Sequence, residues 1–209
     1  MKTCILILFT FSLSLDVACG IKCYECQARN ADHCVGKEHQ CPEGSSCMTV
    51  SELFMLNNKT NHSIQKRCSL NVACNTTQYS LVSEKAQFDI LTTCCERDLC
   101  NDGGFQMPKI TTDRKGYECP ACVSVGTELC TPNITTTCRE ESDKCALFVG
   151  SFKSPDDVDG TVTGQGCASL QVCSHDYTQA VGLYVKDIKE FKCYDPEIKP
   201  QPVVKNSEE

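Results

Sequence analysis

The stretch Cys94-Cys95-Glu96-Arg97-Asp98-Leu99-Cys100-Asn101 places three cysteines within seven positions. It lies in a chain of 209 residues with 20 cysteines, about one residue in ten, which is a density typical of disulfide scaffolds. Disulfides persist in oxidising compartments and are rare in the cytosol. We therefore expect a protein that folds around disulfide bonds outside the cytosol.

The charge balance narrows the function classes. The net charge is −7, from 20 basic and 27 acidic residues, and the chain has no Trp. A nucleic-acid-binding domain would carry a basic patch or stripe, so we expect no nucleic-acid partner. The composition likewise excludes a membrane transporter and a coiled coil.

The two ends of the chain predict secretion. A basic start, an apolar run over residues 4–15 and the small residues Ala18, Cys19 and Gly20 indicate a signal peptide over residues 1–20. Its removal takes Cys4 and Cys19 and leaves 18 cysteines. Residues 194–209 form a polar tail without the terminal apolar run of a glycolipid anchor signal. We expect a secreted, extracellular protein without a membrane anchor.

The cysteine spacing reveals an internal repeat. From Cys23 the intervals are 3, 8, 7, 6, 21, 6 and 20, and from Cys119 they are 3, 8, 8, 7, 22, 6 and 20. Such self-similarity is the sign of a duplicated unit. The first copy holds ten cysteines and the second holds eight, because the second ends at Cys193 without a counterpart of the closing stretch. We predict a first domain over residues 21–102, a linker over 103–118 and a second domain over 119–193.

The segments between the cysteines favour β-strands. Residues 87–93 alternate with a β period, while 146–149 and 160–164 are β-rich and flank a turn at 155–159. No window predicts a capped amphipathic helix. The predicted fold class is all-β and disulfide-rich, with short strands that radiate from a hub of cysteines.

Catalytic and metal-binding interpretations are weaker than structural ones. The two Cys-x-x-Cys units, at Cys23 and Cys119, are typical of redox pairs or zinc ligands, but a redox thiol usually sits at a helix N-terminus. The histidines form no metal-binding array, and no nucleophile elbow or phosphate loop is present. We predict a non-enzyme without catalytic residues, metal or cofactor.

The first copy resembles a three-finger domain of the urokinase-receptor and lymphocyte-antigen type. The resemblance rests on Ile21-Lys22-Cys23-Tyr24-Glu25-Cys26 and on the closing stretch with its final Asn101. Ten cysteines alone can pair in many hundreds of ways, and spacing does not choose among them. The resemblance implies two tandem three-finger domains, with Asn101 as a structural, hydrogen-bonding residue of the hub. It implies the pairs Cys23–Cys47, Cys26–Cys34, Cys41–Cys68, Cys74–Cys94, Cys95–Cys100, Cys119–Cys145, Cys122–Cys130, Cys138–Cys167 and Cys173–Cys193.

The tandem as a whole is similar to the gamma-type phospholipase A2 inhibitors. The shared features are two copies, a complete first domain, a shortened second one, and the entry Gly116-Tyr117-Glu118-Cys119-Pro120-Ala121-Cys122. This resemblance implies a secreted inhibitor of phospholipase A2 that acts by binding. It is also compatible with assembly of the protein into an oligomer. The sodefrin-precursor-like pheromones share the layout, so an extracellular signalling ligand is the alternative.

Surface features suggest glycans and partner contacts. Four Asn-x-Ser/Thr sequons predict glycosylation at Asn58, Asn61, Asn75 and Asn133, although such a motif also occurs by chance. Phe54 and Met55 suit an exposed hydrophobic contact, or else sit in a half-buried strand. Asp156, Asp157 and Asp159 suit attraction of a basic phospholipase, or else form a solvated turn.

Overall fold

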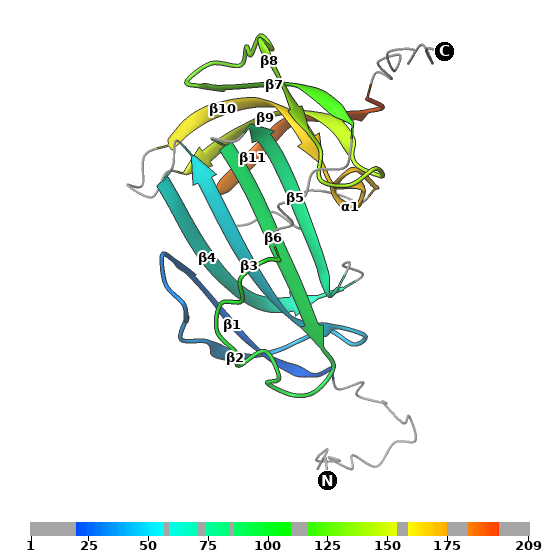
Figure 1. Cartoon of the computed structure of the whole chain (residues 1–209). Helices are drawn as coiled ribbons and strands as arrows, with labels where there is room; N and C mark the ends of the chain where they lie inside the picture. The colour runs from blue at the N-terminus through cyan, green and yellow to red at the C-terminus, as the bar shows by residue number, and fades with distance from the viewer. Residues whose placement is uncertain are drawn as a thin grey trace, which may run out of the picture.

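A computed structural model describes residues 20–56, 59–70, 74–83, 86–109, 117–153, 159–174 and 184–196. The predicted signal sequence through residue 19, with Cys4 and Cys19, lies outside these ranges, as does the tail beyond residue 196. The described residues form eleven strands and one helix of five residues, α1 (Leu170–Ser174) (Figure 1). The prediction of an all-β, disulfide-rich fold is confirmed.

The strands fall into two groups that follow the duplication. The first group is β1 (Lys22–Arg29), β2 (Lys37–Gln40), β3 (Ser46–Leu56), β4 (Lys59–Ser69), β5 (Thr76–Ser83) and β6 (Ala86–Cys95). The second is β7 (Glu118–Val125), β8 (Ile134–Thr137), β9 (Lys144–Lys153), β10 (Asp159–Ala168) and β11 (Val185–Tyr194).

The pairing of the strands repeats between the two copies. In the first copy the order is β6-β3-β4-β1-β2, and in the second the corresponding order is β11-β9-β10-β7-β8, with antiparallel pairing throughout. Cys47 lies opposite Cys68 in the first copy, just as Cys145 lies opposite Cys167 in the second. The first copy has β5 in addition, next to β6. The cysteine intervals and the strand order therefore record the same duplication.

Disulfide bonds form the hub of each copy. Cys23, Cys41 and Cys47 make one buried cluster, and Cys119, Cys138, Cys145 and Cys167 belong to another. The described residues hold nine disulfides, and these are the nine pairs that the resemblance implies: Cys23–Cys47, Cys26–Cys34, Cys41–Cys68, Cys74–Cys94, Cys95–Cys100, Cys119–Cys145, Cys122–Cys130, Cys138–Cys167 and Cys173–Cys193. Neither Cys-x-x-Cys unit is bonded within itself, so both serve the hub. Small domains bury too little apolar surface to do without such bridges.

The closing stretch of the first copy holds strand β1 in place. The backbone N–H of Leu99 donates to the carbonyl of Lys22 at 2.6 Å, and the N–H of Lys22 donates to the Asp98 carboxylate at 3.1 Å. Asn101, which is 4% exposed, binds both backbone groups of Tyr24 at 2.9 Å and donates to the carbonyl of Met48 at 3.3 Å. One side chain thus joins the closing stretch to β1 and β3.

Replacing Asn101 with Ala is expected to cost about 2–3 kcal/mol of unfolding free energy, because partly buried backbone groups of Tyr24 and the buried carbonyl of Met48 lose their partner. Asn101→Asp keeps an acceptor for the Tyr24 N–H but removes the amide donors, and it should not restore full stability. Urea denaturation followed by circular dichroism measures both variants. A loss below about 1 kcal/mol for Asn101→Ala would contradict the hub role.

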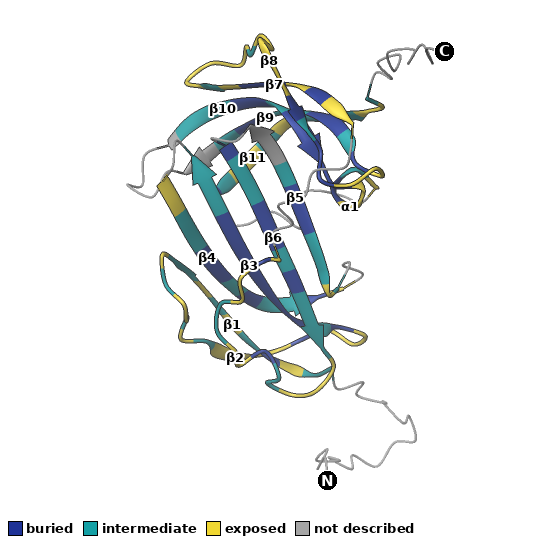
Figure 2. Cartoon of the chain, viewed as in Figure 1, coloured by how far each residue is buried: buried dark blue, intermediate teal, exposed yellow. Residues whose placement is uncertain are grey.

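Part of the predicted linker packs on the first domain. The N–H of Phe105 donates to the Asp32 carbonyl at 2.7 Å, and its ring lies 4.8 Å from that of His62. The N–H of Gln106 donates to the Ser51 hydroxyl at 3.0 Å. Figure 2 shows the buried positions concentrated along the middles of the long strands β3, β4 and β6. Phe105 and Gln106 of the predicted linker therefore extend the first domain, whereas Glu118 already belongs to β7 of the second.

Candidate functional site between the two domains

Two sheet edges meet where the domains join. Strand β10 uses one edge for two neighbours: residues 162–165 pair with β7 of the same domain, and Cys167 and Ala168 pair with Leu81 and Ser80 of β5. The N–H of Ser169 continues the contact by donating to the Tyr79 carbonyl at 2.9 Å. Edge strands are prone to pair with other chains, and here the edge of β5 in the first domain is covered by the edge of β10 in the second. The sheet consequently runs through both domains (Figure 1).

A buried polar cluster sits beside this junction. Arg139, from the loop before β9, donates through Nη1 to Oδ1 of Asp89 at 2.6 Å, and the two side chains are 5% and 0% exposed. The Arg139 guanidinium carbon lies 4.2 Å from the centre of the Tyr79 ring. The Tyr79 hydroxyl donates to the Asp143 carboxylate and accepts from the N–H of Arg139 at 2.9 Å. We call Tyr79, Asp89, Arg139 and Asp143 the junction cluster.

Burial changes the proton affinities within the junction cluster. Desolvation, and then the hydrogen bond to Asp143, raises the pKa of Tyr79 well above its ordinary value. Desolvation also raises the pKa of the Asp143 carboxyl, against hydrogen bonds from Tyr79 and from the Glu140 N–H that lower it. Since every one of these groups has its partner inside the protein, we infer a structural role for the cluster.

Tyr184 makes a second tie between the domains. It is 1% exposed, and its hydroxyl lies 3.1 Å from Oδ1 of Asn30 and 3.2 Å from the His62 carbonyl. Its ring stacks on Phe54 with centroids 5.7 Å apart, and the Arg29 guanidinium lies 5.6 Å from the ring centre. A residue next to β11 is thus anchored in the first domain.

The titration of Tyr184 should report this anchoring. Burial, reinforced by the Glu52 carboxylate, raises the pKa of Tyr184 to about 12 from an ordinary 10.0. Because the folded state prefers the neutral phenol, the stability contributed by Tyr184 is complete below pH 10 and is lost as the pH rises towards 12. In a rapid pH-jump measurement of tyrosinate absorbance, Tyr184→Phe should remove one equivalent near pH 12. If that equivalent instead disappears near pH 10, as in the denatured chain, Tyr184 is not anchored in solution.

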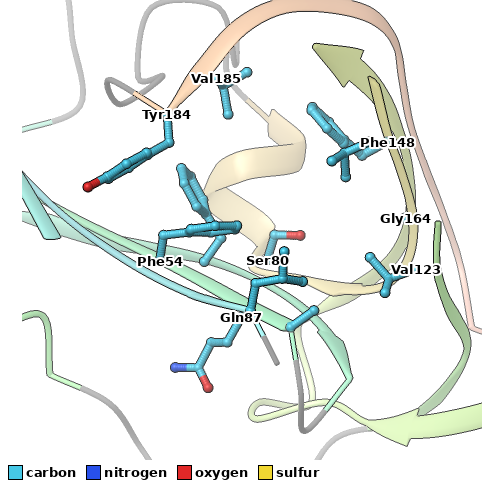
Figure 3. A pocket seen from close by; sticks show the side chains of 12 residues that line it. Phe54, Ser80, Gln87, Val123, Phe148, Gly164, Tyr184 and Val185 are labelled. Carbon is cyan, nitrogen blue, oxygen red and sulfur yellow. The ribbon is translucent and has the colours of Figure 1, made fainter. Parts of the chain in front are cut away.

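An apolar pocket opens between the two domains beside Tyr184. It encloses about 660 Å³, its open side included. Figure 3 shows Phe54 and Tyr184 on one side of it and Phe148 and Val123 on the other. The first domain contributes Phe54, Leu56, Ser80, Ala86, Gln87 and Phe88, and the second contributes Val123, Phe148, Val162, Gly164, Tyr184 and Val185. We call this cavity the interdomain pocket.

The proposed partner-binding residues lie in different settings. Phe54 does not stand at an exposed finger tip: its ring packs against Tyr184 and, at 6.2 Å, against Phe88. Of the two alternatives for Phe54, the half-buried strand agrees with the structure, because the second domain covers this end of β3. Met55 is partly buried on the same strand. Asp156 and Asp157 lie outside the described residues, while Asp159 begins β10.

Three of the four predicted glycosylation sites are described. Asn75 and Asn133 are exposed, and Asn61 is partly buried in β4. Asn58 lies outside the described residues.

Sequence reasoning missed the junction cluster and Tyr184, because no motif or spacing marks residues whose partners are in the other domain.

Comparison with known proteins identifies both halves of the chain. The u-PAR/Ly-6 domain profile matches residues 19–103 and, a second time, residues 115–197. The chain belongs to the u-PAR/Ly-6 family. It is 34% identical over 97 residues to Ly-6/neurotoxin-like protein 1 of Mus musculus, which covers 46% of this chain and 75% of that protein. It is 28% identical over 103 residues to Lymphocyte antigen 6D of Mus musculus, which covers 49% of this chain and 74% of that protein.

A solved structure aligns with most of this chain. The crystal structure of mouse TEX101 aligns with 82% of this chain and 96% of its own length, at 18% identity and a TM-score of 0.38. Proteins of the u-PAR/Ly-6 family are extracellular or cell-surface proteins that bind other proteins and are generally not enzymes. Within the described ranges, no helix has the length and apolar character needed to cross a bilayer. The u-PAR/Ly-6 assignment thus gives this chain an extracellular, protein-binding character.

Proposed function

We propose that this protein is secreted and inhibits secreted phospholipase A2 by binding it directly. The observation that carries the proposal is the fixed junction of two u-PAR/Ly-6 domains, one with ten cysteines and one with eight. This layout is similar to that of the gamma-type phospholipase A2 inhibitors. A rigid binding surface loses less conformational entropy on association, and the junction cluster together with the β5–β10 pairing ties the two domains to each other. The net charge of −7 would also favour a basic enzyme.

The direct test is an inhibition titration. Full-length protein is expressed with its own signal peptide, purified from the medium, and added to a panel of secreted phospholipases A2, some basic and some acidic. We expect saturable binding and a stoichiometric loss of activity with at least one basic enzyme. Absence of binding across the panel would leave the extracellular signalling ligand as the better proposal.

The proposed attraction between the three aspartates near β10 and a basic phospholipase is tested with the triple variant Asp156→Asn, Asp157→Asn, Asp159→Asn. Complementary charge mainly accelerates encounter, so we expect slower association at low salt and little change in dissociation. At high salt the association rates of the variant and the parent protein should become equal, because salt screens exposed charges. Equal association rates of the variant and the parent protein at low salt would contradict the attraction hypothesis. Such a result would not contradict the inhibitor proposal.

Glycosylation is proposed at the four sequons, Asn58, Asn61, Asn75 and Asn133. Enzymatic removal of N-linked glycans from the secreted protein should lower its mass. Mass spectrometry of the treated peptides should show conversion to Asp at each occupied site. Unmodified Asn at the exposed Asn75 and Asn133 would contradict the proposal for these two sites.

A further inference from the structure

The interdomain pocket presents almost no polar group to its interior. Three of the described lining residues have polar side chains: Ser80, Gln87 and Tyr184. Figure 3 shows the Gln87 amide directed away from the cavity, and this amide donates to the buried Asp89 carboxylate. The Tyr184 hydroxyl is engaged with Asn30 and His62. The remaining lining is aliphatic or aromatic side chain and one glycine, Gly164.

The second domain supplies an apolar sheet face to this cavity. Antiparallel partners share a face, and Val123 lies opposite Gly164, which lies opposite Phe148. A Cβ on Gly150 would come within 2.6 Å of the Phe148 ring, so the glycine lets this ring lie close to the sheet. Val123 lines the pocket and is 38% exposed, so the cavity reaches solvent along β7.

The chemistry of the walls selects the occupant. A peptide segment inside the cavity would bring N–H and C=O groups that these walls do not pair, and burying such groups unpaired is costly. A hydrocarbon chain carries no such groups and gains free energy with each methylene that it buries. The open side leaves room for a polar headgroup in water.

We propose that the interdomain pocket binds the acyl chain of a lipid, either a free fatty acid or a lysophospholipid. Both share the hydrocarbon chain that the walls recognise, and they differ in the headgroup at the opening. The site is built by both domains, so binding also depends on their junction. This proposal goes beyond inhibition of phospholipase A2 and does not rest on it.

The test is a fluorescence titration of the full secreted chain with cis-parinaric acid, a fatty acid that fluoresces when its chain is buried. We expect saturable binding of one molecule per protein, displaced by palmitate or by lysophosphatidylcholine. Displacement by only one of the two identifies the headgroup that the opening accepts. The absence of saturable binding would overturn the proposal.

Two matched substitutions on β7 locate the site. Val123→Trp places an indole in the pocket and should weaken parinaric acid binding by about tenfold or more. Val125→Trp is the control, because Val125 is 55% exposed and is not part of the lining. It should leave the affinity within about twofold of the parent protein. Val162→Trp fills the same cavity from β10 and replaces the first variant if Val123→Trp does not fold.

The outcomes separate this proposal from the proposed function. Equal binding of parinaric acid by Val123→Trp and the parent protein would place the lipid elsewhere and overturn the assignment. If the parent protein binds no lipid but Val123→Trp loses affinity for a phospholipase, the pocket is a protein contact and the acyl-chain proposal is wrong. Retained inhibition by a variant that no longer binds lipid supports two independent sites.

Discussion

Replacing Arg139 with Met is expected to lower the free energy of unfolding by about 3–5 kcal/mol. The substitution leaves the Asp89 carboxylate, 0% exposed, without the guanidinium that lies 2.6 Å from it. It also removes the cation 4.2 Å from the centre of the Tyr79 ring. Breaking one side of a buried ion pair is costly because the remaining charge cannot reach water. Since Asp89 belongs to the first domain and Arg139 to the second, the loss should also loosen the junction, which then depends on the β5–β10 pairing and on Tyr184.

Urea denaturation measures the stability, and small-angle scattering of the native protein measures the separation of the domains. Lys22→Met is the matched control, because Lys22 and Glu38 form an exposed pair at 3.4 Å, worth at most about 1 kcal/mol. The double variant Asp89→Leu, Arg139→Met should recover part of the loss, since it removes both members of the buried ion pair. If Arg139→Met costs no more than Lys22→Met, the junction cluster does not hold the domains.

The architecture of each domain was predictable from the chain because its determinants are repeated. Cys23 and Cys119 begin interval series that agree to within one residue, and the strand order repeats in the same way. The pairing of cysteines required the family resemblance, because many pairings satisfy the same spacing. The short helix α1 has no capping or periodic signal that would have marked it, since five residues make little more than one turn.

The site between the domains was not predictable for a physical reason. Tyr79 and Arg139 are single residues, 60 positions apart, whose contact follows from docking and leaves no periodic pattern. The alternation along β3 shows which side chains share a face, but it does not show what covers that face. The sequence therefore left Phe54 either exposed or half-buried in a strand, and it did not predict that Tyr184 stacks on it. Local patterns specify domains, while the junction depends on residues that are distant in sequence.

The missing closing bridge of the second domain makes strand β11 its weakest element. Strand β6 is hydrogen-bonded to β5 and β3 and ends beside the Cys95–Cys100 bridge. Strand β11 is hydrogen-bonded to β9 on one side, and no described strand lies on the other. Its end is tied to α1 by the Cys173–Cys193 bridge, with a separation of 20 residues. The equivalent bridge of the first domain, Cys74–Cys94, has the same separation of 20.

Removing either bridge by paired Cys→Ala changes should cost about 3 kcal/mol, because loops of equal length restrict the unfolded chain equally. The two variants should nevertheless differ locally. Without Cys173–Cys193, β11 loses its covalent tie, and trypsin should cut at the exposed Lys186, Lys189 and Lys192 under native conditions. Without Cys74–Cys94, β11 keeps its own bridge, so no comparable cleavage at these three lysines is expected. Native proteolysis followed by mass spectrometry measures the cleavage of β11 in both variants under the same conditions. Equal protection of β11 in the two variants would mean that β9 pairing and the Tyr184 anchor suffice to hold the shortened domain closed.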